Sequence, residues 1–225
     1  KSLYSNRAKI LRLEDMITTL PNLLTLSRIL AIPALIGAFY LASPLSNWLA
    51  FAIFTVAGIT DILDGYLARS LGEESGLGRF LDPVADKLLV AATLLMLVYV
   101  GRIGEWTILP TVVILCREIL VSGLREFLAE LRVSVPVSRV AKWKTAMQML
   151  AIGFLIVGEA GWDPIPVMEI GRLGMWLAAL FTIYTGYDYL RVGLRHVTAD
   201  VPQSDPVQSN SVRANSVQSD GTDQS

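Results

Sequence analysis

The sequence predicts an all-α integral membrane protein with six transmembrane helices and an N-terminal amphipathic helix at the membrane surface. Two observations support this fold class. First, 53% of the 225 residues are hydrophobic and only 17% are charged, which is unusually apolar for a soluble domain of this length. Second, the apolar residues form long blocks instead of alternating with polar ones, so lipid is the expected solvent around them.

Six apolar blocks are long enough, or nearly so, to cross a bilayer as helices. They cover residues 23–42, 48–69, 83–100, 106–127, 141–158 and 167–190. The connectors 43–47, 101–105 and 159–166 carry few Lys and Arg residues, whereas the segments on the opposite side are rich in them. An excess of Lys and Arg marks the cytoplasmic side of a membrane protein. We therefore expect both termini to lie in the cytoplasm.

The two ends of the chain differ from the blocks between them. Residues 1–20 mix basic and apolar side chains, which predicts an amphipathic juxtamembrane helix; a poorly ordered chain end is the alternative. Residues 21–196 form the predicted six-span domain. Residues 197–225 are rich in Ser, Gln, Asp, Asn and Val and contain no apolar block, so they predict a disordered cytoplasmic tail.

Charged residues enter the predicted spans at their cytoplasmic ends. They are Arg28, Asp61, Asp64, Lys87, Arg117, Glu118, Lys144 and Asp188. An ionisable side chain at membrane depth is costly unless it is paired, solvated or bound to metal. We therefore expect these residues to line one polar cavity that opens to the cytoplasm. A cavity that reaches only halfway through the bilayer favours an enzyme over a channel.

Four aspartates lie on two consecutive predicted helices. The residues at helical spacing are Asp61, Asp64, Gly65 and Ala68 on the first helix and Gly78, Asp82 and Asp86 on the second. Spacings of three and four place each set on one helical face. Because a short loop joins the two helices, we expect them to be adjacent and antiparallel, with the four carboxylates at one membrane depth.

Four carboxylates this close together would repel one another by several kcal/mol unless cations neutralise them. Carboxylate oxygens without nearby His or Cys select hard ions, so we expect Mg²⁺ or Mn²⁺, with two ions in the site. Gly65 and Ala68 leave room for a ligand on the same face, and Arg69 is placed to pair with a phosphate. The alternative is a set of structural salt bridges to Arg69, Arg79 and Lys87.

Together the two segments resemble the signature of the CDP-alcohol phosphotransferase family: D-x-x-D-G-x-x-A-R, eight residues, and then G-x-x-x-D-x-x-x-D. The matching positions are Asp61, Asp64, Gly65, Ala68, Arg69, Gly78, Asp82 and Asp86. The resemblance implies a six-span fold, often homodimeric, with a two-metal site that faces the cytosol. It implies that Asp61, Asp64 and Asp82 bind metal. It also implies that Asp86 shares in this binding and is the base that deprotonates the acceptor hydroxyl.

The CDP-linked lipid is expected to contact the same segments and the start of the first span. The candidate residues are Asn22, Thr25, Asp64, Gly65, Ala68, Arg69 and Gly78. Helix capping explains Asn22 and Thr25 equally well.

Further stretches, which begin at Pro21, Leu81, Arg117 and Lys142, resemble one branch of this family. Members of that branch transfer the phosphatidyl group of CDP-diacylglycerol to sn-glycerol 3-phosphate. The phosphate of this acceptor is a dianion that needs cations, which Arg and Lys side chains supply. The candidates are Arg117, Arg125, Lys142 and Lys144. For the last three, the ordinary excess of positive charge on the cytoplasmic side is the alternative explanation. Another acceptor, such as inositol phosphate, is the alternative within the family.

A divalent-metal transporter is the alternative from a different class of protein. It would need polar residues in both halves of the bilayer, whereas the outer halves of the first five predicted spans are almost wholly apolar. We therefore expect a multi-pass enzyme of the bacterial inner (cytoplasmic) membrane with its active site on the cytoplasmic side. Its expected partners are the two substrates, membrane lipids and a second copy of the chain, with no nucleic acid.

Overall fold

Within residues 20–71, 76–130, 139–161 and 164–199, which this computed structural model describes, every regular element is helical. The elements are α2 (Leu20–Ala38), α3 (Leu45–Leu71), α4 (Gly76–Tyr99), α5 (Glu105–Glu130), α6 (Arg139–Val157), the 3-10 helix η1 (Gly158–Ala160) and α7 (Val167–Ala199). The prediction of an all-α fold is confirmed. The predicted amphipathic helix and the predicted disordered tail lie almost wholly outside the described residues, and both stay predictions.

Each of the six long helices coincides with one predicted apolar block, although the ends shift by several residues. α4 ends where Gly101 adopts a φ of 74°, and α6 ends where Gly158 adopts a φ of 52°. Residues other than glycine rarely adopt such backbone angles, so these two positions stop the helices locally. α7 runs past the predicted span end at residue 190 as far as Ala199. No glycine or proline after Gly193 interrupts it before Pro202, so the helix continues beyond the apolar block.

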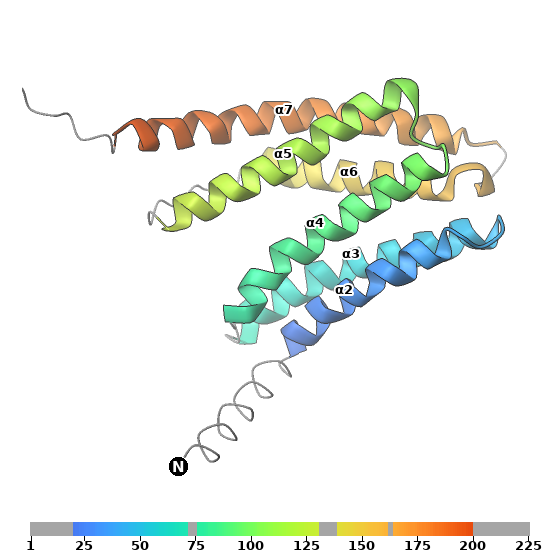
Figure 1. Cartoon of the computed structure of the whole chain (residues 1–225), viewed down its shortest axis with the longest axis horizontal. Helices are drawn as coiled ribbons and strands as arrows, with labels where there is room; N and C mark the ends of the chain where they lie inside the picture. The colour runs from blue at the N-terminus through green and yellow to red at the C-terminus, as the bar shows by residue number, and fades with distance from the viewer. Residues whose placement is uncertain (1–19, 72–75, 131–138, 162–163, 200–225) are drawn as a thin grey trace, which may run out of the picture.

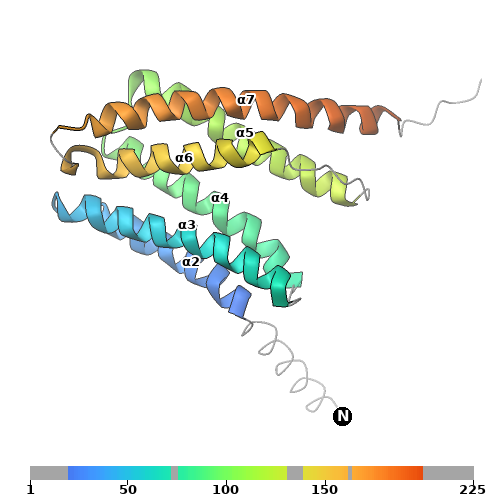
Figure 2. The same cartoon turned by 180° about the vertical axis from the view of Figure 1, so that it is seen from behind.

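The helices form two neighbouring groups (Figure 1). In the first group α2 packs along both α3 and α4, and in the second α7 packs along both α5 and α6. Contacts between α3 and α6, and between α4 and α5, join the two groups, as the view from behind also shows (Figure 2). The start of α2 and the end of α7 lie at the same end of the bundle, as an even number of long helices requires.

The two aspartate-bearing helices run antiparallel, as predicted (Figure 1), and their aspartates approach each other. Among the described residues, the more extensive contacts of α3 and α4 are made with α2, which packs along both of them. Arg28 of α2 pairs with aspartates of both helices.

The interior and the outer surface of the bundle are both apolar. Leu35, Leu94, Leu97, Ile152 and Leu155 are almost completely buried between α2, α4 and α6. Many large apolar side chains also point outward, among them Leu30, Leu95, Leu120, Leu150 and Leu180. Water-soluble proteins rarely expose contiguous apolar surface of this extent, which indicates that lipid surrounds the bundle.

Three of the helices are long and apolar enough to cross a membrane: Leu45–Leu67, Glu105–Ala129 and Val167–Arg191. The apolar stretch of α2, Asn22–Ala38, is shorter. α4 and α6 carry charged residues of the site in their first halves, which shortens their apolar stretches. Within the described residues, helices able to span a membrane are therefore confirmed, and the count of six spans stays a prediction.

Candidate functional site

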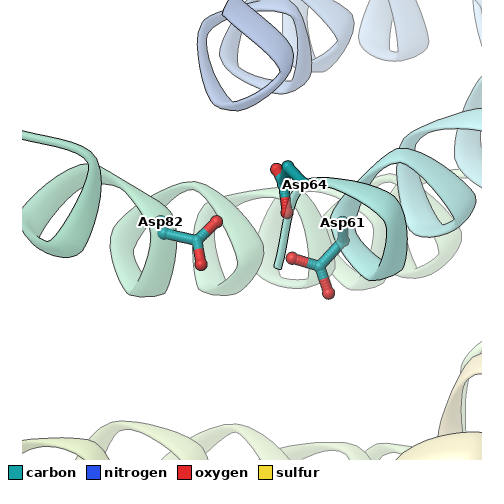
Figure 3. A group of neighbouring side chains, drawn as sticks. All are labelled: Asp61, Asp64 and Asp82. Atoms are coloured by element: carbon teal, nitrogen blue, oxygen red, sulfur yellow. The ribbon is translucent and has the colours of Figure 1, made fainter. Parts of the chain in front are cut away.

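Three carboxylates converge where α3 and α4 approach each other. Asp61 and Asp64 lie one turn apart on α3, and Asp82 points toward them from α4 (Figure 3). Each residue offers an oxygen that lies within 4.8 Å of the corresponding oxygens of the other two. Asp64 is buried, while Asp61 and Asp82 are half-buried. The structure thus brings together three of the four aspartates that the sequence singles out.

Arg28 of α2 places its guanidinium among these three acids. Its side chain is 1% exposed, and its Nη1 lies 2.5 Å from Asp61 Oδ1. Its Nη2 donates to Asp64 Oδ2 and lies 3.2 Å from Asp82 Oδ1. The sequence located Arg28 within the first span without suggesting a role for it. Its depth in the predicted span could have indicated a role, because an arginine in a membrane-spanning helix requires an anionic or polar partner.

The three acids fit a hard divalent cation. Their ligand atoms are all carboxylate oxygens, which are the donors that Mg²⁺ and Mn²⁺ prefer. One of these atoms, Asp64 Oδ1, is buried and lacks a hydrogen-bond partner within the part of the chain that the structure describes, and Asp82 Oδ1 is buried with only the ion pair to Arg28 among the described contacts. Buried side-chain oxygens usually have a partner. A metal ion is a natural partner for carboxylate oxygens arranged in this way.

Asp86 lies one turn beyond Asp82 on α4 and lines the same cavity. It stands outside the group of three acids whose oxygens lie within 4.8 Å of one another. Even so, it lines the same cavity as Asp61 and Glu118. The four predicted metal ligands are thus arranged as three together and one beside them. The dual role of Asp86 as metal ligand and base stays a prediction.

The residues predicted to contact the CDP-lipid surround the acids. Asn22 and Thr25 are buried on α2 and precede Arg28 at intervals of three residues, so all three lie along one face. Gly65 lines the cavity and Gly78 is half-buried near the start of α4. The structure does not describe the side chains of Ala68 and Arg69, which were also predicted to contact the CDP-lipid, or that of Lys142, which was predicted to bind the acceptor.

The other basic residues predicted to bind the acceptor line the same cavity. Arg117 and Arg125 come from α5, and Lys144 comes from α6. Arg117 Nη2 donates to Thr185 Oγ1 of α7 at 3.0 Å. A Cβ atom at Gly186 would lie 3.2 Å from Arg117 Cγ, so the absence of a side chain lets the arginine lie against α7.

Glu118 and Tyr189 complete this basic group; the sequence placed Glu118 in the polar cavity without a role and did not single out Tyr189. Glu118 accepts hydrogen bonds from Lys144 Nζ and, at 3.2 Å, from Arg117 Nη1. Tyr189 is 5% exposed, and its hydroxyl accepts a hydrogen bond of 3.0 Å from Arg125 Nη2. Its ring centroid lies 5.8 Å from Arg117 Cζ and 5.4 Å from Arg125 Cζ, within the range of cation–π attraction. No sequence spacing reveals a tyrosine 64 residues from its partner.

One cavity of about 1210 Å³ joins the acids Asp61, Asp82 and Asp86 to the basic group. Its polar part is lined by Asp61, Asp82, Asp86, Lys87, Arg117, Glu118, Arg125 and Lys144. Its apolar part is lined by Trp48, Phe51, Phe54, Met149, Leu150, Phe154, Val157 and Val167. The apolar walls belong largely to the first half of α3 and the second half of α6, away from the acids. The cavity is therefore amphipathic, and it exceeds the volume of about 300–1,000 Å³ that is usual for sites of small ligands.

Comparison with known proteins gives relatives that match nearly over their full length. The chain is 48% identical over 172 residues to a protein of Rickettsia bellii, covering 76% of this chain and 93% of that protein. It is 36% identical over 214 residues to a protein of Cereibacter sphaeroides, covering 80% and 97%. It is 42% identical over 174 residues to a protein of Shigella flexneri, covering 76% and 92%. Each of these relatives is named CDP-diacylglycerol–glycerol-3-phosphate 3-phosphatidyltransferase.

The family model for CDP-alcohol phosphatidyltransferases matches residues 18–184. This range begins just before α2, ends within α7 and contains Arg28, the four aspartates and the basic residues of α5 and α6. The matched range is about three quarters of the sequence, and the chain belongs to the CDP-alcohol phosphatidyltransferase family.

Proposed function

We propose that this protein transfers the phosphatidyl group of CDP-diacylglycerol to sn-glycerol 3-phosphate, which yields phosphatidylglycerophosphate and CMP. The observation that carries the proposal is the single cavity in which an acid cluster, a basic group and an apolar wall are continuous. Each part suits one portion of the two substrates: the pyrophosphate, the acceptor phosphate and the acyl chains. The names of relatives at 36–48% identity support the same reaction.

The pyrophosphate of CDP-diacylglycerol is expected to lie beside Asp61, Asp64 and Asp82. In our proposal these residues, with Asp86, would hold two Mg²⁺ or Mn²⁺ ions. Bound there, such ions would supply charge stabilisation for the pyrophosphate and for the departing CMP. Four carboxylates alone would repel an anionic substrate, so the cluster by itself could not bind the nucleotide. Asn22, Thr25, Gly65, Ala68, Arg69 and Gly78 would surround the nucleotide.

The reaction is an attack of the acceptor hydroxyl on the phosphorus that bears the diacylglycerol. A new bond forms between the acceptor oxygen and this phosphorus, and the bond from phosphorus to the oxygen of CMP breaks. The proton of the hydroxyl goes to a base, for which Asp86 is our candidate. It lines the same cavity as Asp61, Asp82 and the basic group, which supports this role.

The acceptor phosphate is expected to bind Arg117, Arg125 and Lys144. Arginine can hold two phosphate oxygens at once, while lysine supplies a compact charge. Glu118 and Tyr189 would keep these cations in place before the acceptor arrives, since both contact two of them. An acceptor without a phosphate would leave this group of cations largely unused, which supports a phosphorylated alcohol.

The apolar part of the cavity would hold the acyl chains. Phe51, Phe54, Met149 and Phe154 contribute side chains that make no strong polar contact and suit hydrocarbon. A lipid substrate enters such a site from the bilayer without passing through water. We further propose six membrane-spanning helices, both termini and the site on the cytoplasmic side of a bacterial inner membrane, and a homodimeric assembly. The distribution of Lys and Arg supports the orientation, and the family resemblance supports the dimer.

The test is a reaction of the purified protein with CDP-diacylglycerol and a panel of acceptors. The panel contains glycerol 3-phosphate, inositol phosphate, inositol, serine and glycerol, and the assay follows CMP release and the mass of the lipid product. We expect product with glycerol 3-phosphate that exceeds the acceptors without a phosphate by at least about a hundredfold, since buried cations discriminate strongly against an uncharged analogue. Product with inositol phosphate should also be lower, and a preference for it would refute the choice of acceptor. A preference for an unphosphorylated acceptor would refute the assignment of the acceptor. Absence of turnover with every member of the panel would refute the assignment of the reaction.

A further inference from the structure

Arg28 has a geometry that a simple salt bridge does not require. Its guanidinium is nearly inaccessible, with 1% of the side chain exposed, and it pairs with three separate carboxylates from two helices. One nitrogen faces Asp61, and the other faces both Asp64 and Asp82. A planar guanidinium can span several acceptors in this way, whereas a single ammonium cannot.

The oxygens that pair with Arg28 belong to the three acids that could ligate a metal ion. The arginine forms ion pairs with Asp61 Oδ1, Asp64 Oδ2 and Asp82 Oδ1. The three acids each offer an oxygen within 4.8 Å of those of the other two. A divalent cation in this group would therefore bind carboxylates that also pair with the guanidinium, and it would lie close to a like charge.

The charges of the group show what this sharing does. Three carboxylates and one guanidinium leave a formal charge of −2, which one divalent ion balances. Without the guanidinium, three negative charges, one of them buried, would face one another with no cation from the described contacts. Buried charges of one sign destabilise the fold until a counter-ion arrives. Arg28 thus stabilises the empty ligand set and at the same time repels the ion that would fill it.

We propose that Arg28 is a positioning residue that holds Asp61, Asp64 and Asp82 together as a ligand set and lowers the affinity of this set for divalent cations by competing for it. The inference rests on the metal site of the proposed function and adds a residue to it. Its consequence is that the ion is held loosely enough to come and go with the nucleotide, because Arg28 offsets part of the negative charge of the acids when the ion is absent.

The test measures metal binding and stability without any substrate. We would determine the Kd for Mn²⁺ of the purified, detergent-solubilised protein from the spectroscopic signal of free Mn²⁺. We would also measure the unfolding midpoint with a chelator and with saturating Mg²⁺. The variants are Arg28→Gln, which removes the charge, and Arg28→Lys, which keeps the charge but reaches fewer carboxylates. A unit charge about 5 Å from a divalent ion repels it appreciably even at an effective dielectric constant of about 20.

A matched control is available at the other end of the bundle. Arg102, in the turn between α4 and α5, donates to the carbonyl oxygens of Leu155, at 3.1 Å, and Ile156, and to Asn47 Oδ1. This turn lies at the end of the bundle opposite to the start of α4, where Asp82 is found (Figure 1). Arg102→Gln should therefore lower the unfolding midpoint while it leaves the Kd for Mn²⁺ unchanged.

We expect Arg28→Gln to lower the unfolding midpoint measured in chelator and to bind Mn²⁺ about tenfold more tightly than wild type. Saturating Mg²⁺ should raise the unfolding midpoint of this variant by more than it raises that of wild type. Arg28→Lys should fall between the two proteins in both measurements. An unchanged Kd, or weaker Mn²⁺ binding in Arg28→Gln, would overturn the proposal, because then the arginine only supports the fold. If Arg28→Gln fails to fold even with Mg²⁺, Arg28→Lys decides: a metal-induced shift equal to that of wild type overturns the proposal. A wild-type protein that binds no Mn²⁺ would instead refute the metal site of the proposed function.

Discussion

Replacing Lys144 by Met removes one positive charge from the cavity and keeps most of the side-chain volume. Lys144 is 2% exposed, and its ammonium pairs with Glu118. If this ammonium also holds the phosphate of glycerol 3-phosphate, the variant should lose kcat/KM for the acceptor. The KM for CDP-diacylglycerol should barely change, because its phosphates are expected to lie beside the aspartates of α3 and α4.

The expected magnitude follows from the burial of Lys144. A hydrogen bond to a charged group contributes about 1.5–3 kcal/mol, which corresponds to about ten- to a hundredfold in kcat/KM. The upper part of this range applies here for two reasons. The contact is shielded from water, and the carboxylate of Glu118 would keep only its 3.2 Å ion pair with Arg117 and would then repel the phosphate. Lys144→Arg should recover only part of the loss, because a planar fork does not replace a compact charge in a confined pocket.

The assay is steady-state kinetics in which the concentrations of both substrates vary independently. Arg172→Met is the matched control, because it removes the same charge from α7 at a surface position where Arg172 pairs only with the exposed Glu169 among the described contacts. The control should show wild-type kinetics for both substrates. A Lys144→Met variant with normal acceptor kinetics would refute the reasoning. Equal losses for both substrates would refute it as well, because the effect would not be specific to the acceptor.

Three further predictions concern the other parts of the cavity. Asp61→Asn or Asp82→Asn should reduce turnover by several orders of magnitude while the protein still inserts and folds, since each removes a proposed metal ligand; near-normal turnover at saturating Mg²⁺ would contradict the two-metal proposal. Tyr189→Phe keeps the ring that lies against two arginines but loses the hydroxyl, so the acceptor KM should rise about two- to tenfold, and Tyr189→Leu should raise it further. Gly153→Val should raise the KM for long-chain CDP-diacylglycerol more than for a short-chain analogue, because a Cβ there already approaches Phe51 to 3.2 Å; equal effects on both would argue against an acyl-chain site.

Local patterns in the sequence predicted much of the fold. Each predicted apolar block became one long helix, because block length, glycine and proline positions are properties of neighbouring residues. The spacing of Asp61 and Asp64 on one face of α3 was predictable for the same reason. The convergence of these two residues with Asp82 was also predictable, since the loop between α3 and α4 is too short to carry the two helices far apart.

Contacts between distant segments were not predictable in this way. Arg28 lies 36 residues before Asp64, and its partners depend on α2 packing against both α3 and α4. Adjacency in sequence likewise does not reveal that α2 packs against both α3 and α4. Tyr189 meets Arg125 only because α7 returns alongside α5.

The sequence by itself therefore determined the class of fold, the helices and the identity of the charged residues that enter them, because these follow from local composition and helical period. It also determined the family, through a motif whose spacing reflects two consecutive helices. Only the tertiary structure decided which cation neutralises the acids, which side chains hold the basic group, and that polar and apolar walls form one cavity. These features arise from the packing of helices that are far apart in the chain, and such contacts cannot be read from the spacing of residues in the sequence.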